Sequence, residues 1–397
     1  MTLPDQPKRF FGLSGKGLGI IIIAVIVVCV GVSATVLVVS RLASTVTTAL
    51  NQPTDTPEPT RKPPTATLLP TATRLPTDTP TPAPTATPEP GQSRSNPLPP
   101  NSIVHAAHWE VQVLEFKRGQ EAAQLIREAN QFNEPAPEGK EYLMVKVRAK
   151  SLHIDGQSHL ITGGDFKLTG DRVTRYLPVG VVPPAPPLGA EVFSSGETEG
   201  WIVYAIDQGE EQLMVDFDPL VSTDYQPVFI ALQPGAAISV DPMLSDVAPT
   251  DLGRTHEQPA QLGDTLITDD WQVTILEAIR GSKAYDMAKA ANQFNDPPAA
   301  GMEYLAVRAR VKSLNPKDDF VLIDSGSFKT IGDKQVLYDA PAVVDPEPVL
   351  QAYLYPGGEV EGWVILQIGQ GEHSAQIVFD PLFDTEHSNR RYIALSH

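Results

Sequence analysis

The chain of 397 residues contains one sequence pattern twice, and corresponding residues are separated by 162 positions. Residues 109–152 and 271–314 are identical at 22 of 44 positions. The matches continue through residues 196–201 and 358–363, and through 217–220 and 379–382. Repetition at one fixed spacing indicates a tandem duplication. It predicts two copies of one domain, at residues 97–233 and 259–397, joined by a linker at 234–258.

The pattern within each copy is mostly that of β-strands. In the segment 142–152, apolar Leu143, Val145 and Val147 alternate with Lys146 and Arg148, as in a strand with one solvent-facing side. About seven short strands separated by turns are typical of an antiparallel sandwich. The expected strands of the first copy are 109–116, 142–152, 166–168, 173–177, 200–206, 212–217 and 228–232.

One segment of each copy has a helical pattern instead. Residues 121–131 of the first copy place Ala122, Leu125 and Ile126 on one stripe at helical spacing. The segment that follows, 129–133, recurs as 291–295 with the sequence Ala-Asn-Gln-Phe-Asn. We expect its amides to cap the helix end and hold the next loop, and its Phe to plug the sandwich. The fold class is therefore mainly β: two tandem immunoglobulin-like antiparallel β-sandwiches, each with one short helical insertion.

The order of motifs in each copy resembles a known family. A W-x-V strand comes first, followed by G-x-E-Y-L-x-V, a central F-K, a G-E-x-E-G-W strand, an F-D-P-L turn and a closing I-A-L. This order is similar to that of telokin-like, immunoglobulin-fold domains of unknown function, which are related to a secreted immunoprotective antigen and occur in bacterial surface lipoproteins and anchored proteins. The resemblance implies a fold and an extracellular setting, but no activity. The helical insertion and the segment 129–133 depart from the pattern.

The N-terminal region predicts a membrane anchor. Residues 18–39 contain no charge, and 22 residues as a helix span roughly 33 Å, which matches a bilayer core of about 30 Å. Lys8, Arg9 and Lys16 precede this run and only Arg41 closely follows it, so the N-terminus is expected in the cytoplasm. We expect a cytoplasmic tail at 1–17 and a transmembrane helix at 18–40 embedded in the lipid bilayer. A cleaved signal peptide is the alternative, but its apolar core is usually about 7–15 residues.

A low-complexity segment follows the predicted anchor. Residues 52–90 contain 12 Pro and 12 Thr, a composition that cannot form a packed core. It predicts a disordered stalk over 41–96, with O-glycosylation as a further hypothesis. The net charge of the whole chain is −18, and the net charge of residues 101–397 is −21. Such an acidic region argues against a nucleic-acid partner.

Candidate catalytic and metal-binding groups do not recur in both copies. The four His of the first copy (His105, His108, His153, His159) correspond to Ile267, Asp270, Asn315 and Val321. Asp216 and Asp218 suggest calcium, but only Asp380 is retained in the second copy, and a turn-forming role is expected for Asp218 and Asp380. Glu199 and Glu361 lie in separate copies. We therefore expect no enzyme, no catalytic, cofactor-binding or metal residue, and no cofactor.

Two Pro-containing loops are the expected contact surface. Residues 177–188 and 340–350 are rigid and apolar, and such patches often mark interaction sites when they are exposed. The alternative is packing against the edge of their own sandwich. The residues expected to make contact are Val181, Val182, Pro183, Pro184, Leu188, Val343, Val344 and Leu350.

These observations predict a single-pass protein of the cell membrane that displays two domains outside the cell. Its expected function is a non-enzymatic binding or adhesion module for an extracellular protein or glycan. A structural spacer or assembly subunit of the cell envelope is the alternative. A surface hydrolase is a third and weaker interpretation.

Overall fold

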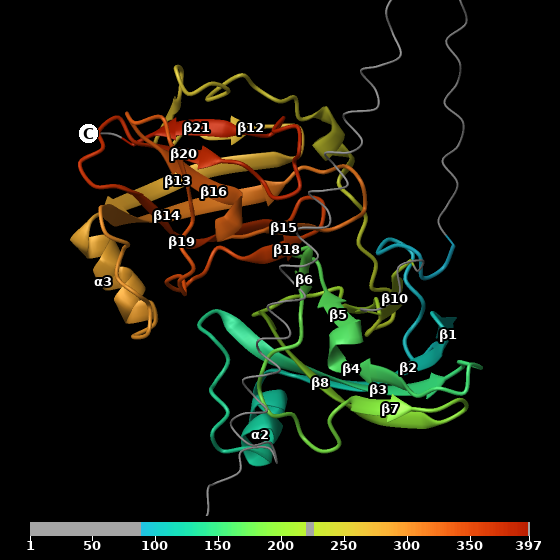
Figure 1. Cartoon of the computed structure of the whole chain (residues 1–397). Helices are drawn as coiled ribbons and strands as arrows, with labels where there is room; N and C mark the ends of the chain where they lie inside the picture. The colour runs from blue at the N-terminus through green and yellow to red at the C-terminus, as the bar shows by residue number, and fades with distance from the viewer. Residues whose placement is uncertain (1–88, 220–225, 396–397) are drawn as a thin grey trace, which may run out of the picture. The chain divides into compact units, whose positions relative to one another are not determined.

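The computed structural model describes residues 89–219 and 226–395. The predicted anchor and most of the predicted stalk lie outside this part of the chain. None of the helices formed by the described residues is long and apolar enough to cross a membrane. The described residues are mainly β, with antiparallel sheets and two short α-helices (Figure 1).

The first repeat is built on an antiparallel sheet with the order β1-β2-β3-β8. Its strands are β1 (Ile103–Ala106), β2 (Trp109–Arg118), β3 (Lys140–Ser151) and β8 (Glu197–Asp207). Facing it are β5 (Phe166–Thr169), β6 (Thr174–Tyr176), β9 (Met214–Phe217) and β10 (Val228–Ala231), together with the two-stranded sheet of β4 (His159–Thr162) and β7 (Gly189–Val192). All seven predicted strands are present. The strands β1, β4 and β7 were not predicted.

The second repeat has the same plan. Its first sheet has the order β12-β13-β14-β19, with β12 (Thr265–Ile267), β13 (Trp271–Arg280), β14 (Met302–Ser313) and β19 (Glu359–Gly369). Its other strands are β11 (Ala260–Gln261), β15 (Val321–Ile323), β16 (Phe328–Ile331), β17 (Leu337–Asp339), β18 (Ala352–Leu354), β20 (Gln376–Phe379) and β21 (Arg391–Ala394). Short 3₁₀ segments lie at Gly163–Asp165 in the first repeat, at Pro242–Asp246 between the repeats and at Ser325–Ser327 in the second repeat.

The main core of each repeat lies between its sheets. In the first repeat Trp109, Val145 and Val147 on one side pack with Phe166 and Phe217 on the other. Val145 and Val147 are positions that the alternation of β3 assigns to the buried face. Phe166 and Phe217 lie with their ring centroids 4.9 Å apart. The corresponding core of the second repeat includes Trp271, Val307, Val311, Phe328 and Phe379.

A helix covers the opposite face of the first sheet in each repeat. Helix α2 (Gly119–Ala129) buries Ala122 and Ile126 against Tyr142 and Met144 of β3 and Val203 of β8 (Figure 1). Helix α3 (Ser282–Ala291) does the same with Ala284 and Ala288. The predicted helix at 121–131 is present, shifted by two residues. Its packing explains why the first half of β3 is buried on both faces, although the alternation predicted one wet face.

One sheet continues from the first repeat into the second. Strand β6 pairs antiparallel with β18, so that Arg175 lies opposite Tyr353 and Thr174 opposite Leu354. The resulting six-stranded sheet has the order β10-β9-β5-β6-β18-β15. We call this contact the internal joint. The repeat pattern in the sequence did not predict it.

Candidate functional site

The end of helix α2 is fixed by one asparagine. Asn133 donates from Nδ2 to the carbonyl oxygen of Ile126, at the helix end, and to that of Val182, in the Pro-rich loop, both at 2.8 Å. Its Oδ1 accepts the backbone N–H of Val182 at 3.0 Å. One side chain thus gives a carbonyl of the last helical turn a second donor, beside the backbone N–H of Asn130, and fastens the loop to the helix. The prediction that this amide caps the helix end is confirmed, whereas the loop that it holds is the Pro-rich loop and not the segment directly after it.

The second repeat contains the same clamp. Asn295 donates to the carbonyl oxygens of Ala288 at 2.7 Å and Val344 at 2.8 Å, and it accepts from the N–H of Val344 at 2.9 Å. In each repeat a tyrosine also fastens the segment that follows. The hydroxyls of Tyr142 and Tyr304 donate to the backbone carbonyl oxygens of Glu134 and Asp296.

The clamp leaves large apolar side chains exposed beside it. Phe132 and Phe294 are each 81% exposed. Their backbone N–H groups donate to the side-chain oxygens of Asn130 and Asn292, and these short turns direct the Phe side chains away from the helix. The prediction that Phe plugs the sandwich is therefore wrong. We call Phe132 with Val182, and Phe294 with Val344, the clamp surfaces.

The eight predicted contact residues fall into three groups. Val182 and Val344 are 50% and 49% exposed. Val181, Pro183, Pro184 and Val343 are half-buried, and Val181 and Val343 pack against the clusters under the helices. Leu188 and Leu350 are 7% and 0% exposed, so their placement on a contact surface is wrong.

The burial of these two leucines has a simple cause. The N–H groups of Leu188 and Leu350 donate to the carbonyl oxygens of Trp201 and Trp363, at 3.1 and 3.0 Å. This pairing ends each Pro-rich loop against the first sheet and turns the leucine side chain into the main core. Each loop therefore reaches the surface before its final leucine, which belongs to the core.

The paired aspartates of the first repeat contact cations of the chain itself. Arg175 donates to Asp216 at 2.6 Å and also binds Asp218. Lys167 donates to the backbone carbonyl oxygen of Asp218 at 2.5 Å. Burial raises the pKa of Asp216, against the opposing effect of Arg175. Because these carboxylates already have cationic partners, the arrangement serves the fold.

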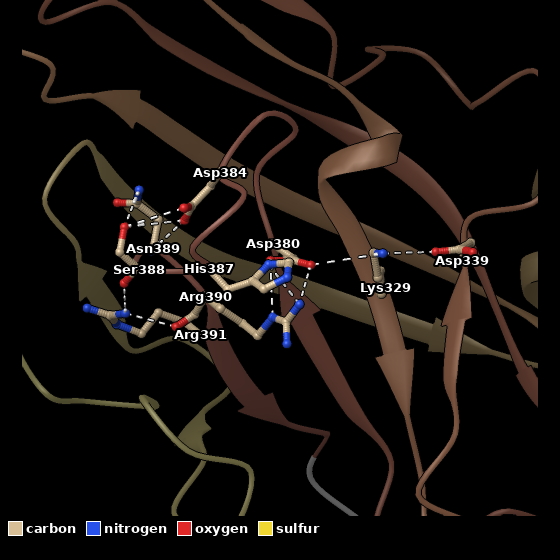
Figure 2. Close-up of polar contacts among 9 residues, drawn as sticks. All are labelled: Lys329, Asp339, Asp380, Asp384, His387, Ser388, Asn389, Arg390 and Arg391. Carbon is tan, nitrogen blue, oxygen red and sulfur yellow. Dashed lines mark hydrogen bonds and ion pairs between the residues drawn. The ribbon is translucent and has the colours of Figure 1, made fainter. Parts of the chain in front are cut away.

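Asp380 of the second repeat is engaged in the same way (Figure 2). It accepts from Nδ1 of His387 at 2.8 Å and from the guanidinium of Arg390 at 3.1 and 2.8 Å, and Lys329 lies 3.9 Å away. Although burial opposes the shift, the bonds from Arg390 and His387 lower the pKa of Asp380. Asp380 thus connects the loop after β20 to β16.

The remaining candidates from the sequence contact other side chains of their own repeat. Glu199 forms an ion pair with Lys146, and Glu361 with Arg308 and Arg310. The rings of His153 and His159 are stacked at 3.5 Å. Within residues 89–219 and 226–395, no group of three or more His, Cys, Asp or Glu side chains is placed to hold a metal ion.

One pair of sites was missed by the sequence reasoning. Tyr176 donates to the buried Glu210 at 2.6 Å, and Tyr338 donates to Glu372 at 2.5 Å. Burial raises the pKa of Glu210 to about 7. The fixed spacing of 162 residues between both Tyr and both Glu was the signal that could have identified them.

No protein-family model and no curated protein matches the chain. A putative lipoprotein (ycdA) from Bacillus subtilis aligns at 16% identity and a TM-score of 0.26, over 33% of this chain and 38% of that chain. The yjhA protein from Bacillus subtilis aligns at 13% identity and a TM-score of 0.25, over 34% of this chain and 98% of that chain. An uncharacterized β-sandwich protein from Clostridium difficile aligns at 10% identity and a TM-score of 0.23, over 36% of this chain and 100% of that chain. The matched region therefore spans less than half of the ycdA lipoprotein.

Proposed function

We propose that this chain is a membrane-anchored, extracellular binding module without enzymatic activity, in which two immunoglobulin-like sandwiches present the clamp surfaces to a protein or glycan partner. The observation that carries the proposal is the repetition of an exposed Phe beside an Asn-fastened loop. Phe132 and Phe294 have the same exposure and the same supporting hydrogen bonds. A rigid support keeps the entropic cost of binding low.

The energies are sufficient for a measurable contact. Complete burial of a Phe side chain contributes on the order of 1.5–3 kcal/mol. Two surfaces on one chain increase the apparent affinity further when one target, or neighbouring targets, can engage both. A hydrolase is not favoured, because the candidate carboxylates are held by ion pairs or by hydrogen bonds within the fold.

The test is affinity capture with the full chain in detergent. The double variant Phe132→Ser/Phe294→Ser removes both exposed rings, and Met243→Ser, at a residue 70% exposed elsewhere, is the matched control. We expect a specific envelope component to be retained by the wild type and by the control, and lost from the double variant. Equal retention by all three proteins would exclude the clamp surfaces as the binding site.

The second candidate function is an assembly subunit of the envelope. Strands β7 and β17 each pair with a single neighbour among the described strands. Unpaired strand edges are sites at which another chain can add. The two functions use different residues, so they can be tested separately.

A further inference from the structure

The internal joint uses one edge from each repeat and leaves the corresponding edges free. At the spacing of 162 residues, β6 corresponds to β17 and β18 corresponds to β7. Strand β6 pairs with both β5 and β18, whereas β17 pairs with β16 alone among the described strands. Likewise β18 pairs with β15 and β6, whereas β7 pairs, within the same part of the chain, with β4 alone. The chain therefore presents both halves of a second joint, one on each repeat.

The free edges have the same backbone register as the edges already joined. Tyr176 lies opposite Leu168, and Tyr338 lies opposite Thr330, the corresponding residue. The registers of β15 with β18 and of β4 with β7 correspond in the same way. A residue just before each edge strand also has a positive φ, 52° at Val173 and 57° at Gln335.

One backbone hydrogen bond of the internal joint has a corresponding donor and acceptor on the two free edges. Val173 accepts the backbone N–H of Tyr355 at 2.8 Å. The corresponding pair is the carbonyl of Gln335 and the N–H of Phe193. The conformation that presents the Val173 carbonyl is retained at Gln335, so the same bond can form between two chains.

The side chains at the two joints differ as a set. In the internal joint Asp216 accepts from Arg175 at 2.6 Å and from the hydroxyl of Tyr355 at 3.2 Å. Their counterparts are Val378, Leu337 and Phe193. A buried polar group without a partner is costly, and here the donors and the acceptor are all replaced by apolar residues. The changes are mutually compatible.

The exposed fractions of these side chains show which of them are not covered by a partner strand. Tyr355 is 2% exposed in the internal joint, whereas its counterpart Phe193 is 65% exposed. On the other free edge Val336 and Leu337 are 46% and 40% exposed. Leu160, on the outer face of the two-stranded sheet of β4 and β7, is 63% exposed.

We propose that copies of this chain associate head to tail, with β17 of one copy pairing antiparallel with β7 of the next. The register of the internal joint places Leu337 opposite Glu191 and Val336 opposite Val192. The contact is heterologous, so it generates an open row or a closed ring of chains. It lacks a counterpart of the ion pair between Arg94 and Asp318, whose corresponding residues are His256 and Gly156. The joint between chains is therefore weaker than the internal one.

Disulfide crosslinking of the full chain in detergent tests this register. In a Cys29→Ser background, Glu191→Cys and Leu337→Cys are prepared separately, mixed and mildly oxidised. Residues directly opposite in an antiparallel pair have Cα atoms about 4.5–5.5 Å apart, which suits a disulfide. We expect a crosslinked dimer in the mixture and not in either variant alone, and a series of larger products from the double variant. A mixture of Glu191→Cys with Lys283→Cys, on exposed helix α3, is the control.

A second pair of variants separates this association from the proposed binding function. Phe193→Glu changes an exposed residue of the free edge, so it leaves the fold intact, and we expect it to reduce the crosslinked dimer about tenfold. Phe132→Glu, in a clamp surface, should leave the dimer unchanged. Crosslinking no greater than in the Lys283→Cys control, or unaffected by Phe193→Glu, would overturn the proposal without bearing on the clamp surfaces.

Discussion

Two related glutamates allow the cost of a buried charge to be measured within one chain. Glu210 is fully buried, and its Oε1 accepts the backbone N–H of Arg172 at 3.0 Å while its Oε2 accepts from the hydroxyl of Tyr176. Burial raises its pKa from 4.5 to about 7, and the charges of Asp207 and Asp171 contribute to this shift. Its counterpart Glu372 lacks the first of these neighbours, because Gly369 replaces Asp207.

The shift of Glu210 defines a window of pH. The folded repeat binds this proton more tightly than the unfolded chain does. The stabilising contribution is therefore fully present below about pH 4.5 and is lost as the pH rises through about 7. A pKa difference of about 2.5 corresponds to roughly 3 kcal/mol. For Glu372, burial opposes the shift, but the bonds from Tyr338 and Lys334 lower the pKa. Its ionised form is thus the favoured one.

The perturbation is Glu210→Gln, with Glu372→Gln as the matched control. The substituted glutamine keeps an acceptor and is neutral at every pH. We expect the free energy of unfolding of Glu210→Gln, minus that of the wild type, to increase by about 3 kcal/mol as the pH rises from about 4.5 to about 8. The control should show no such improvement. Urea unfolding followed by hydrogen exchange in β9 and β20 reports each repeat separately. The same pH difference in both variants would refute the reasoning.

Three further changes have clear expected outcomes. Asn133→Ala and Asn295→Ala each remove the three hydrogen bonds that join the helix end to the Pro-rich loop, so we expect losses of about 2–3 kcal/mol in urea unfolding and faster hydrogen exchange at the start of each Pro-rich loop. Burial raises the pKa of Asp345 to about 6, so its stabilising contribution falls as the pH rises through about 6, and Asp345→Asn should weaken this pH dependence in unfolding curves. Tyr355→Phe removes one donor to the buried Asp216, and we expect a loss of about 1–3 kcal/mol, measured as a lower midpoint of thermal unfolding.

The sequence predicted the strands whose apolar pattern is clear and missed three short ones, β1, β4 and β7, although each of them contributes a side chain to the core. Strand β3 is long and alternates, so the pattern identifies it directly. Strand β7 has the sequence Gly-Ala-Glu-Val, which has no β pattern, and its extended form depends on pairing with β4. Helix α2 was predicted within two residues, because its apolar stripe matches the surface that β3 and β8 offer.

The candidate site shows the same limit. The repeated Asn side chains were correctly expected to cap the helix end, because amides commonly do so, but the loop that they hold is the Pro-rich loop and not the next segment. Hydrophobicity alone assigned Phe132 to the interior, but the turn closed by Asn130 holds it outside. Leu188 was assigned to the surface by its Pro-rich neighbours, and pairing with Trp201 buries it. Both errors arise from backbone hydrogen bonds that composition does not encode.

The side chains at the two joints also disfavour pairing of an edge of one joint with an edge of the other. If β6 of one chain paired with β7 of another, Asp216 would face Phe193 and would lose the hydroxyl of Tyr355 that it accepts in the internal joint. If β17 paired with β18, the hydroxyl of Tyr355 would face Val378 and have no acceptor. An unsatisfied buried polar group costs about 1–3 kcal/mol, so each edge disfavours the wrong partner. The joint within the chain and the proposed joint between chains therefore form without competing. For the same reason Phe193→Tyr should weaken the proposed association, because its added hydroxyl would meet Val378.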